Sequence, residues 1–355
     1  MLPPSRSEKT ASTQRLPRPL VVQYLYVHAP GESFEYPSSR SHGGVRRLAA
    51  RYLECVLVQA ASLRLRGVEC DLAFVTNADD ARALGRRGAQ LLGQIEGLGV
   101  EIVLAEYAHR PHAEVKRFAS SRYVFDAILA ACARTSPDTT LWLVDVDCVW
   151  LDAAKVFAAA PRSPALGATH IPYPPDWEFR EFTLRSVAEL AIEMGAPEDS
   201  LRWVGGELLA GTAGDLRALV ATCEDLELEV TERGHQLATE EQLLSLAAAL
   251  GRARFEDLTA VARRIWTGPR HDAPPVADPG SLGLLHLPSE KGLAFRRSAR
   301  EIGAGRTEHF VRDLELPSRA LKRFNVEGTG WARQLRDDGW LALQRAQERL
   351  LSRHG

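Results

Sequence analysis

Apolar and polar residues alternate along this chain in blocks that predict buried strands separated by amphipathic helices. Short runs dominated by Val, Leu and aromatic residues are typical of strands buried on both faces of a sheet, whereas apolar residues recurring every three or four positions indicate helices. The strand-like runs fall at residues 20–28, 71–76, 100–105, 141–150, 203–212 and 282–288, and the helical stretches at 46–66, 81–98, 118–133, 185–194, 215–224 and 239–250. This alternation favours an α/β fold with a doubly wound, mostly parallel sheet flanked by helices.

The two ends of the chain depart from this pattern. Residues 1–17 are polar, rich in Pro and Ser, and lack the apolar core of a signal peptide, so we expect a disordered head. Residues 18–295 form one predicted domain. Residues 296–355 are basic with a helical pattern, and we expect a C-terminal helical extension for which peripheral membrane contact stays open. No stretch of about 18 apolar residues occurs, so we expect no transmembrane segment.

Composition narrows the class of protein. With 45% hydrophobic and 25% charged residues, the chain has the make-up of an ordinary globular protein. Its formal net charge of -2 argues against a general nucleic-acid binder, which carries a strongly basic balance. The five cysteines are scattered without a Cys-x-x-Cys pair, which favours free thiols in a cytoplasmic protein.

Two aspartates carry the clearest chemical signal. Asp145 and Asp147 interrupt the apolar run at 141–150, and residues two apart on a strand project to the same side. Two neighbouring buried carboxylates are costly unless a cation neutralises them. The pair therefore predicts a divalent metal at the C-terminal end of this strand, where open α/β sheets place their ligands. The alternative is that both carboxylates cap the strand and are solvated in a loop.

Further polar motifs follow at the ends of later predicted elements. They are Gly205-Gly206-Glu207 within a strand, Glu240-Glu241-Gln242 at a helix start, and His286 with Lys291-Gly292 after the last strand. Each also has a plain structural interpretation. Thr239 and Gln242 fit a helix capping box, and His286 fits a core histidine.

In this order the motifs resemble those of nucleotide-sugar-dependent glycosyltransferases of the GT-A fold, nearest in pattern to the glycogenin-like family 8 enzymes. Some features are also similar to the blood-group transferases. The resemblance covers residues 20–295. Asp145 and Asp147 match the family's Asp-x-Asp motif, and Glu240-Glu241 is similar to its Asp-Gln element beside the anomeric carbon. The family's usual Asn is replaced by Gly205-Gly206-Glu207, and the segment from His286 to Gly292 is one residue shorter than the family's and lacks its Pro-Trp ending.

The resemblance implies transfer of a sugar from a nucleoside-diphosphate sugar to an acceptor hydroxyl, with Mn²⁺ or Mg²⁺ bound and the anomeric configuration retained. A histidine ligand favours Mn²⁺ over Mg²⁺. Glu241 is the expected catalytic carboxylate and Glu207 its competitor, while Tyr173 and Trp177 are expected to stack on the acceptor. The remaining expected contacts are the metal ligands Asp145, Asp147 and His286 and the nucleotide-binding residues His28, Asn77, Arg117, Arg122, Asp145, Lys291 and Gly292.

Three other functions stay open on the sequence. Asp145-Val-Asp147 also fits the nucleophile motif of haloacid-dehalogenase-type phosphatases, in which Asp145 would attack phosphorus, but no later strand ends in the acidic pair that closes their magnesium site. A nucleotidyltransferase would need a Gly-rich turn after the first strand, which Ala29-Pro30-Gly31 matches poorly. A transferase-like module without catalytic activity would have lost metal-dependent affinity for nucleotides.

Overall fold

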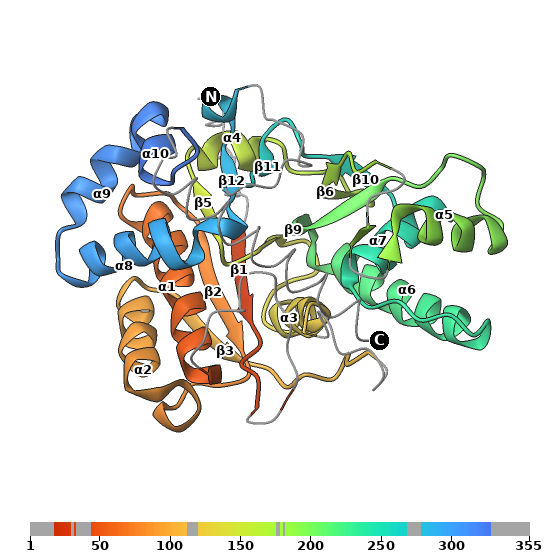
Figure 1. The fold of residues 1–355 in the computed structure, drawn as a ribbon, viewed down its shortest axis with the longest axis horizontal. Coiled ribbons are helices and arrows are strands. Elements are labelled where there is room, and N and C mark those ends of the chain that lie inside the picture. The colour runs from red at the N-terminus through yellow and green to blue at the C-terminus, as the bar shows by residue number, and fades with distance from the viewer. Residues whose placement is uncertain are drawn as a thin grey trace, which may run out of the picture.

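A seven-stranded sheet forms the centre of the protein (Figure 1). The computed structural model describes residues 18–29, 32, 44–111, 120–174, 178–179, 182–267 and 278–327. The strand order is β10-β6-β9-β4-β1-β2-β3. In chain order its strands are β1 (Leu20–Leu25), β2 (Asp71–Thr76), β3 (Glu101–Leu104), β4 (Thr140–Val144), β6 (Leu166–Ile171), β9 (Trp203–Thr212) and β10 (Phe255–Asp257).

Every strand of this sheet except β9 runs in one direction, because β9 pairs antiparallel with both β4 and β6 while the other pairs are parallel. A smaller sheet of order β11-β12-β5 joins β5 (Cys148–Trp150), β11 (Ala262–Arg264) and β12 (Leu284–His286). Two-residue strands β7 (Glu178–Phe179) and β8 (Phe182–Thr183) pair with each other. The predicted α/β class with a mostly parallel sheet is confirmed.

Helices cover both faces of the large sheet. The helices are α1 (Gly44–Arg64), α2 (Ala81–Gly97), α3 (Tyr123–Cys132), α4 (Ala153–Ala158), α5 (Leu184–Glu193), α6 (Ala213–Glu232), α7 (Glu240–Ala249), α8 (Arg296–Gly303), α9 (Thr307–Leu314) and α10 (Pro317–Arg323). Short turns η1 (Pro279–Ser281) and η2 (Pro288–Glu290) and a π-helix, η3 (Lys291–Phe295), complete the described elements. Figure 1 shows α1, α2 and α8 on one side of the sheet and α3 and α6 on the other.

Alternation along β4 explains why both faces are covered. Leu141 and Leu143 pack into the core shared with α3, α6 and α7, whereas Trp142 and Val144 pack into the core shared with α1 and α2. All four side chains are buried. A strand that is apolar at every position needs a helical layer on each side, which is what its continuous apolar run predicted.

The predicted single strand at 141–150 is wrong in one respect. β4 ends at Val144, and residues 145–147 form a turn before β5 begins at Cys148. The strand breaks because β5 pairs antiparallel with β12 in the smaller sheet rather than continuing in the large one. The two aspartates therefore lie in a turn between two sheets instead of on one strand face.

The segment after residue 295 completes the core of the main sheet. Phe310, Phe324 and Leu314 are buried in the same cluster as Trp142, and α8 contacts α1 and η3. The helical character expected from residue 296 onward is present through α10, while residues 328–355 lie outside the described part. Helices α8 to α10 are thus packed against the sheet layer rather than separate from it.

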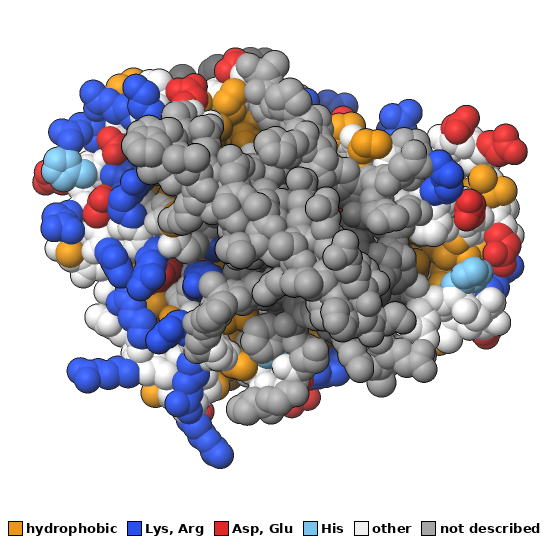
Figure 2. All heavy atoms as spheres, in the orientation of Figure 1, with side chains coloured by type: hydrophobic (Ala, Val, Ile, Leu, Met, Phe, Trp, Pro, Cys, Tyr) orange, Lys and Arg blue, Asp and Glu red, His pale blue; other side chains and the backbone are white. Residues whose placement is uncertain are grey.

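Basic side chains gather on one side of the molecule. In Figure 2 they lie on the left, over α1, α2 and α8, where the exposed arginines include Arg47, Arg82, Arg86, Arg296 and Arg300. Burial raises the pKa of Glu54 on α1, and the nearby Arg87, Arg296 and Arg300 oppose that rise. A net charge near zero therefore hides an uneven distribution of charged side chains over the surface.

Peripheral membrane contact stays a prediction. In the described residues no helix has the length and apolar content needed to cross a bilayer. The five cysteines are buried and are not joined in disulfides.

His109 joins the loop after β3 to helices α3 and α6. Its Nδ1 lies 2.7 Å from Asp126 Oδ1 on α3, and its Nε2 lies 2.9 Å from Glu224 Oε1 on α6. The hydrogen bond with Asp126 raises the pKa of His109, against a smaller opposing effect of burial. When it is protonated, the imidazole bridges two carboxylates on different helices.

This bridge predicts a pH-dependent contribution to stability. Because the folded-state pKa is raised, the contribution is full below the ordinary histidine pKa of about 6.5 and is lost as pH rises through the folded-state value. Each unit of difference corresponds to about 1.4 kcal/mol. Urea unfolding of wild type and His109→Gln at about pH 5.5 and about pH 8.5 should show a stability gap that shrinks at the higher pH. His309→Gln on exposed α9 is the control, and a gap that is equal at both pH values would contradict the bridge.

Candidate metal site and cavity

Two aspartates and one histidine come together at the C-terminal edge of β4. Ligand atoms of Asp145, Asp147 and His286 all lie within 4.8 Å of one another. His286 Nε2 is 3.4 Å from Asp145 Oδ2 and 3.2 Å from Asp147 Oδ1. The smaller sheet produces this meeting, since β12 pairs with β5 so that His286 lies opposite Cys148. Residues 139 positions apart in the chain (286 − 147) thereby share one site.

Backbone hydrogen bonds hold the turn that carries the aspartates. Asp145 N donates to Glu207 O at 3.0 Å, and Gln59 Nε2 donates to Asp145 O at 2.8 Å. Leu287 N donates to Asp147 O at 2.9 Å. The turn is therefore fixed by β9, by α1 and by the strand that carries His286, and its carboxylates have little freedom to move apart.

The two carboxylates have different electrostatic environments. Burial, together with the neighbouring Asp147, raises the pKa of Asp145 to about 6. Asp147 is only 1% exposed, against 36% for Asp145. Burial alone would raise the pKa of Asp147, but Lys291 and His286 outweigh it and hold that pKa well below its usual range. Asp147 is therefore the more readily ionised of the two carboxylates.

This donor set fits a divalent cation. Carboxylate oxygens are hard ligands, and an imidazole nitrogen adds a ligand that suits Mn²⁺ and other first-row metals. Each aspartate raises the free energy of ionising the other, and a histidine faces both. A bound cation stabilises this arrangement. Asp145, Asp147 and His286 are thus the residues that would hold the metal.

Lys291, at the start of η3, neutralises Asp147 in this structure. Its ammonium group donates a hydrogen bond to Asp147 Oδ2, and both side chains are buried. Burial opposes the charge on Lys291, but Asp147 outweighs it and raises the pKa of Lys291. Lys291 lies 5.4 Å from the Tyr52 ring centroid on α1, so its ammonium also faces an aromatic surface. A permanent positive charge therefore lies beside the metal ligands.

Arg264 connects the metal ligands to a second pair of carboxylates. Its Nε donates to His286 Nδ1 at 3.3 Å, which turns His286 Nε2 toward the aspartates. Its Nη2 donates to Glu207 Oε2 at 2.7 Å and also to Glu241 Oε1. Burial raises the pKa of Glu207, but Arg264 outweighs this and lowers it below the usual range. Glu207, which is 1% exposed, is consequently ionised at neutral pH.

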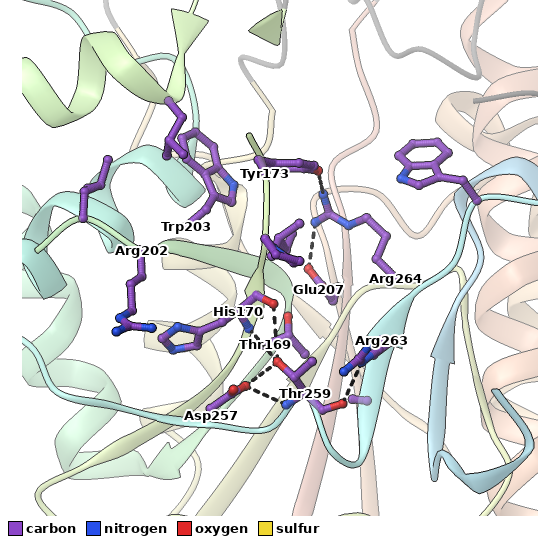
Figure 3. Close-up of a pocket in the computed structure, with 16 residues that line it drawn as sticks. Thr169, His170, Tyr173, Arg202, Trp203, Glu207, Asp257, Thr259, Arg263 and Arg264 are labelled. Carbon is purple, nitrogen blue, oxygen red and sulfur yellow. Dashed lines mark hydrogen bonds and ion pairs between the residues drawn. The ribbon is translucent and has the colours of Figure 1, made fainter. Parts of the chain in front are cut away.

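Glu207 and Arg264 border a cavity of about 410 Å³ (Figure 3). Glu207, Arg264, Tyr173 and Trp203 lie at one end of it, with Tyr173 Oη accepting from Arg264 Nη1 at 3.1 Å. Trp203 Nε1 donates to Glu241 Oε2 at 2.8 Å, which fixes the carboxylate behind the cavity wall. A volume of this size, lined by aromatic rings and a few polar groups, is typical of a small-molecule site.

Two glycines of β9 make room for these side chains. A Cβ at Gly205 would lie 2.3 Å from Glu207 Oε2, and a Cβ at Gly206 would lie 2.4 Å from Glu240 Oε1. The pairing of β6 with β9 also shifts register between Ala168 and Thr169, opposite this segment. Such bulges re-aim side chains next to active sites, and here the irregularity coincides with Glu207.

Gly206→Ala is expected to destabilise the protein by about 1–3 kcal/mol, because the new methyl group overlaps a buried carboxylate. Gly93→Ala is the matched control on exposed α2, where no atom lies within 4 Å of the added Cβ, and a gain of up to about 1 kcal/mol is expected. Urea unfolding measures both changes. Equal effects of the two substitutions would show that β9 does not require glycine at this point.

Glu240 differs from its neighbour Glu241. It is buried, its Oε2 has no hydrogen-bond partner in the structure, and burial together with Glu241 raises its pKa to about 8. It is therefore mostly protonated at neutral pH. The predicted capping box of this helix is present, with the Thr239 side chain accepting from Gln242 N.

Arg122 and Asn77, two other predicted nucleotide-binding residues, make hydrogen bonds that hold the fold together. Arg122 is buried and donates to Glu227 on α6 and to Leu237 O, which commits its guanidinium to packing α3. Asn77 exchanges two hydrogen bonds with the backbone of Val27, at 2.6 and 2.9 Å, and so joins the ends of β1 and β2. Neither contact supports the predicted role, and both roles stay predictions.

His28 and Gly292 are two further predicted nucleotide-binding residues within the described part of the chain. His28 is buried beside Glu32, and burial lowers its pKa to about 4, so it is neutral at physiological pH. Gly292 is the second residue of η3, where an added Cβ would lie 3.7 Å from the Arg51 guanidinium on α1. Arg117 and Trp177 lie outside the described residues.

Sequence reasoning missed Arg264, and with it the segment 251–267. That segment contains β10 and β11, which are three residues long and show no readable period. An arginine within the apolar run Val261-Ala-Arg-Arg-Ile265 was the available signal, because a charged side chain in a buried strand needs a partner. Trp203 was placed in a strand, but its contact with Glu241 was not foreseen.

No protein-family model matches the chain, and no curated protein matches its sequence. Solved structures with a similar arrangement include the galactosyltransferase LgtC in complex with donor and acceptor sugar analogs, at 12% identity and a TM-score of 0.45, covering 82% of this chain and 95% of that one. An active-site mutant of LgtC gives the same identity and TM-score over 76% and 86% of the two chains. The apo form of mouse xyloside xylosyltransferase 1 shares 10% identity, with a TM-score of 0.45 over 76% and 97%. Likenesses this loose assign no activity to the chain, so its function has to be inferred from its own residues.

Proposed function

We propose that this chain is a metal-dependent glycosyltransferase of the GT-A type, which moves a sugar from a nucleoside diphosphate to an acceptor hydroxyl. One observation carries the proposal. Arg264 contacts His286 of the Asp145–Asp147–His286 cluster and also Glu207, which borders the cavity, and Glu241 behind the cavity wall. A site for a diphosphate-bound cation and a site for a small polar acceptor are therefore adjacent and share one side chain.

The residues divide the chemistry between them. A bound divalent cation would supply Lewis-acid stabilisation for the charge that develops on a departing diphosphate. Lys291 places a second positive charge beside Asp147, where it can stabilise phosphate oxygens. Glu207 and Glu241 provide carboxylates next to the cavity, and the ionised Glu207 is suited to accept a proton from an acceptor hydroxyl.

Arg264 keeps Glu207 charged. Without this guanidinium, burial would raise the pKa of Glu207. Trp203 and Tyr173 offer ring faces and edges on which the apolar face of a sugar packs. We propose that the anomeric configuration of the sugar is retained. Identification of the product anomer by NMR tests this.

A nucleotide-binding panel tests the proposal. UDP, GDP, dTDP and ADP are each added with and without Mn²⁺ to wild type and to Asp145→Asn, and thermal unfolding is recorded. Asp145 is the more exposed aspartate, and among the described residues it forms no ion pair with a lysine, so this variant is expected to fold. A ligand at about 100 times its dissociation constant stabilises by about 2.7 kcal/mol. Manganese-dependent stabilisation by one nucleotide, lost in the variant, is the expected result.

The phosphatase hypothesis predicts a different outcome of the same panel. That chemistry would give no response to diphosphates and a magnesium-dependent response to fluoroberyllate. It also needs further acidic ligands next to Asp145, whereas across the described ranges the metal-compatible group found there is completed by His286. The described geometry therefore favours the transferase.

A further inference from the structure

Two buried glutamines lie next to the turn that carries Asp145 and Asp147. Gln23 on β1 is 1% exposed, and Gln59 on α1 is 0% exposed. The buried side chains of α1 are otherwise mostly apolar. An amide placed in such surroundings costs free energy unless it is hydrogen-bonded, so the contacts of these two side chains need an explanation.

The two amides form a chain of hydrogen bonds that ends on the backbone of Asp145. Gln59 Nε2 donates to Asp145 O at 2.8 Å. Gln59 Oε1 accepts from Gln23 Nε2, which also donates to Val56 O at 3.3 Å. Because the Gln59 oxygen faces Gln23, its nitrogen faces Asp145, and Gln23 thereby fixes which way the Gln59 amide is turned. Strand β1 brings Gln23 to this place, since Gln23 pairs with Val144, the residue before Asp145.

The carbonyl oxygen of Asp145 also closes the turn. Cys148 N donates to the same oxygen at 3.2 Å, so Asp145 and Asp147 are the first and third residues of a four-residue turn. This oxygen belongs to the planar peptide group that joins Asp145 to Val146, and its direction sets the backbone dihedral angles on both sides. Rotation of that one peptide group would therefore move the Asp145 carboxylate relative to the Asp147 carboxylate.

Stability alone does not account for the two glutamines. Gln23 Oε1 is buried and, in the described part of the chain, has no hydrogen-bond partner, which costs free energy. Two apolar side chains of the same shape would avoid this cost, because replacing both partners of a buried hydrogen bond in that way is often nearly neutral. The hydrogen bonds are instead suited to specify one arrangement of the turn.

We propose that Gln59, oriented by Gln23, is a positioning residue for the divalent cation, because it fixes the turn in the geometry that binds metal. The inference rests on the proposed function, which places the metal on Asp145, Asp147 and His286. Interactions that orient metal ligands without touching the metal typically change its affinity by about 10- to 100-fold. Helix α1, which supplies no ligand to the described cluster, thus helps to set the metal affinity.

Binding of Mn²⁺ alone tests the inference, without nucleotide or acceptor. Free Mn²⁺ is measured by electron paramagnetic resonance as the full chain is titrated, and circular dichroism confirms that each variant is folded. Gln59→Met removes the donor at similar volume and is expected to raise the dissociation constant for Mn²⁺ about 10-fold. Gln23→Met should raise it less. The double variant should bind Mn²⁺ no more weakly than Gln59→Met, because both side chains act through one contact.

A second variant of Gln59 and a matched control separate positioning from general loosening. Gln59→Asn keeps an amide that is one carbon too short to reach Asp145 O, and it should lose affinity as Gln59→Met does. Ser62→Ala is the control, because buried Ser62 lies one turn further along α1 and accepts from Trp150 N at 3.3 Å, at the far end of the same segment. It should bind Mn²⁺ as wild type does.

Three results would overturn the inference. They are wild-type Mn²⁺ affinity in both Gln59 variants, an equal loss of affinity in Ser62→Ala, and a double variant whose loss is the product of the two single losses. The last result would show that Gln23 and Gln59 act independently.

The inference and the proposed function fail separately. If the nucleotide panel responds but the glutamine variants bind Mn²⁺ as wild type does, the transferase stands and the positioning role fails. If Mn²⁺ affinity depends on Gln59 while no nucleotide stabilises the protein, the positioning role stands and the transferase fails. Absence of Mn²⁺ binding to wild type would overturn the positioning role, and nucleotide binding without metal would then leave a metal-independent transferase.

Discussion

Asp147→Asn is expected to lower the free energy of unfolding by about 3–5 kcal/mol, because it leaves the buried ammonium group of Lys291 without its partner. The amide keeps the shape of the carboxylate, so lost packing contributes little. Urea unfolding in EDTA measures the change. Asp145→Asn, whose carboxylate is more exposed and is not paired with lysine, should cost clearly less.

A double substitution separates charge from shape. Asp147→Asn combined with Lys291→Gln removes both charges and should recover most of the lost stability, since a buried ion pair and a neutral polar pair of similar volume are close in free energy. If the double variant is as unstable as the sum of the two single variants, the pair does not interact, and Lys291 does not neutralise Asp147.

Lys291 and a metal ion should also compete for the same carboxylate. Lys291→Met removes the ammonium group from the buried Asp147 carboxylate and leaves it only His286, so added Mn²⁺ should raise the unfolding free energy of this variant more than that of wild type. The comparison needs no activity measurement. An equal response of the two proteins to Mn²⁺ would place the metal away from Asp147.

Arg264→Gln is expected to have an effect of similar size, about 3–5 kcal/mol near neutral pH, because two carboxylates lose one shared cation. Glutamine keeps a hydrogen-bond donor but no charge. Arg264→Lys should lie between wild type and Arg264→Gln, since a single ammonium group is unable to reach Glu207, Glu241 and Tyr173 together.

The pH dependence identifies the cause. In wild type the lowered pKa of Glu207 contributes stability that is present above the ordinary glutamate pKa of about 4.3 and is lost as pH falls through the folded-state value. Without Arg264, burial dominates and raises that pKa, so the variant loses stability as pH rises. The difference in unfolding free energy between wild type and Arg264→Gln should widen from about pH 5 to about pH 8. This loss of stability with rising pH should be absent from the double variant Arg264→Gln with Glu207→Gln. A gap independent of pH would mean that packing, rather than charge, is lost.

The two aspartates of the candidate metal site could be singled out from sequence because their signal is local. Asp145 and Asp147 stand out in an apolar run, and the capping box of α7 is read from Thr239 and Gln242 alone. The break after Val144 was not predictable, because it depends on β5 pairing with β12, far along the chain. Arg122 was expected at a phosphate because it precedes the Asp-x-Asp strand, where the resembled family has a nucleotide-contacting arginine. Its partner Glu227 lies in the part of α6 beyond residue 224, where the predicted helix ended.

Arg264 was missed for a related physical reason. Its partners Glu207 and Glu241 are 57 and 23 residues away, and nothing within three-residue β11 indicates which of its side chains faces inward. Periodicity identifies the buried face of an element only when several turns or alternations repeat. The cavity, which depends on Arg264, was therefore outside the reach of sequence analysis.

The ion pair between Asp147 and Lys291 also bears on how the protein is made. It joins residues 144 positions apart, and at about 5–20 residues per second a ribosome needs roughly 7–30 s to extend the chain from one to the other. Throughout that interval β4 and the Asp147 turn have been synthesised while the cation that neutralises the turn has not. A nascent chain therefore has no assembled site until η3 has been synthesised.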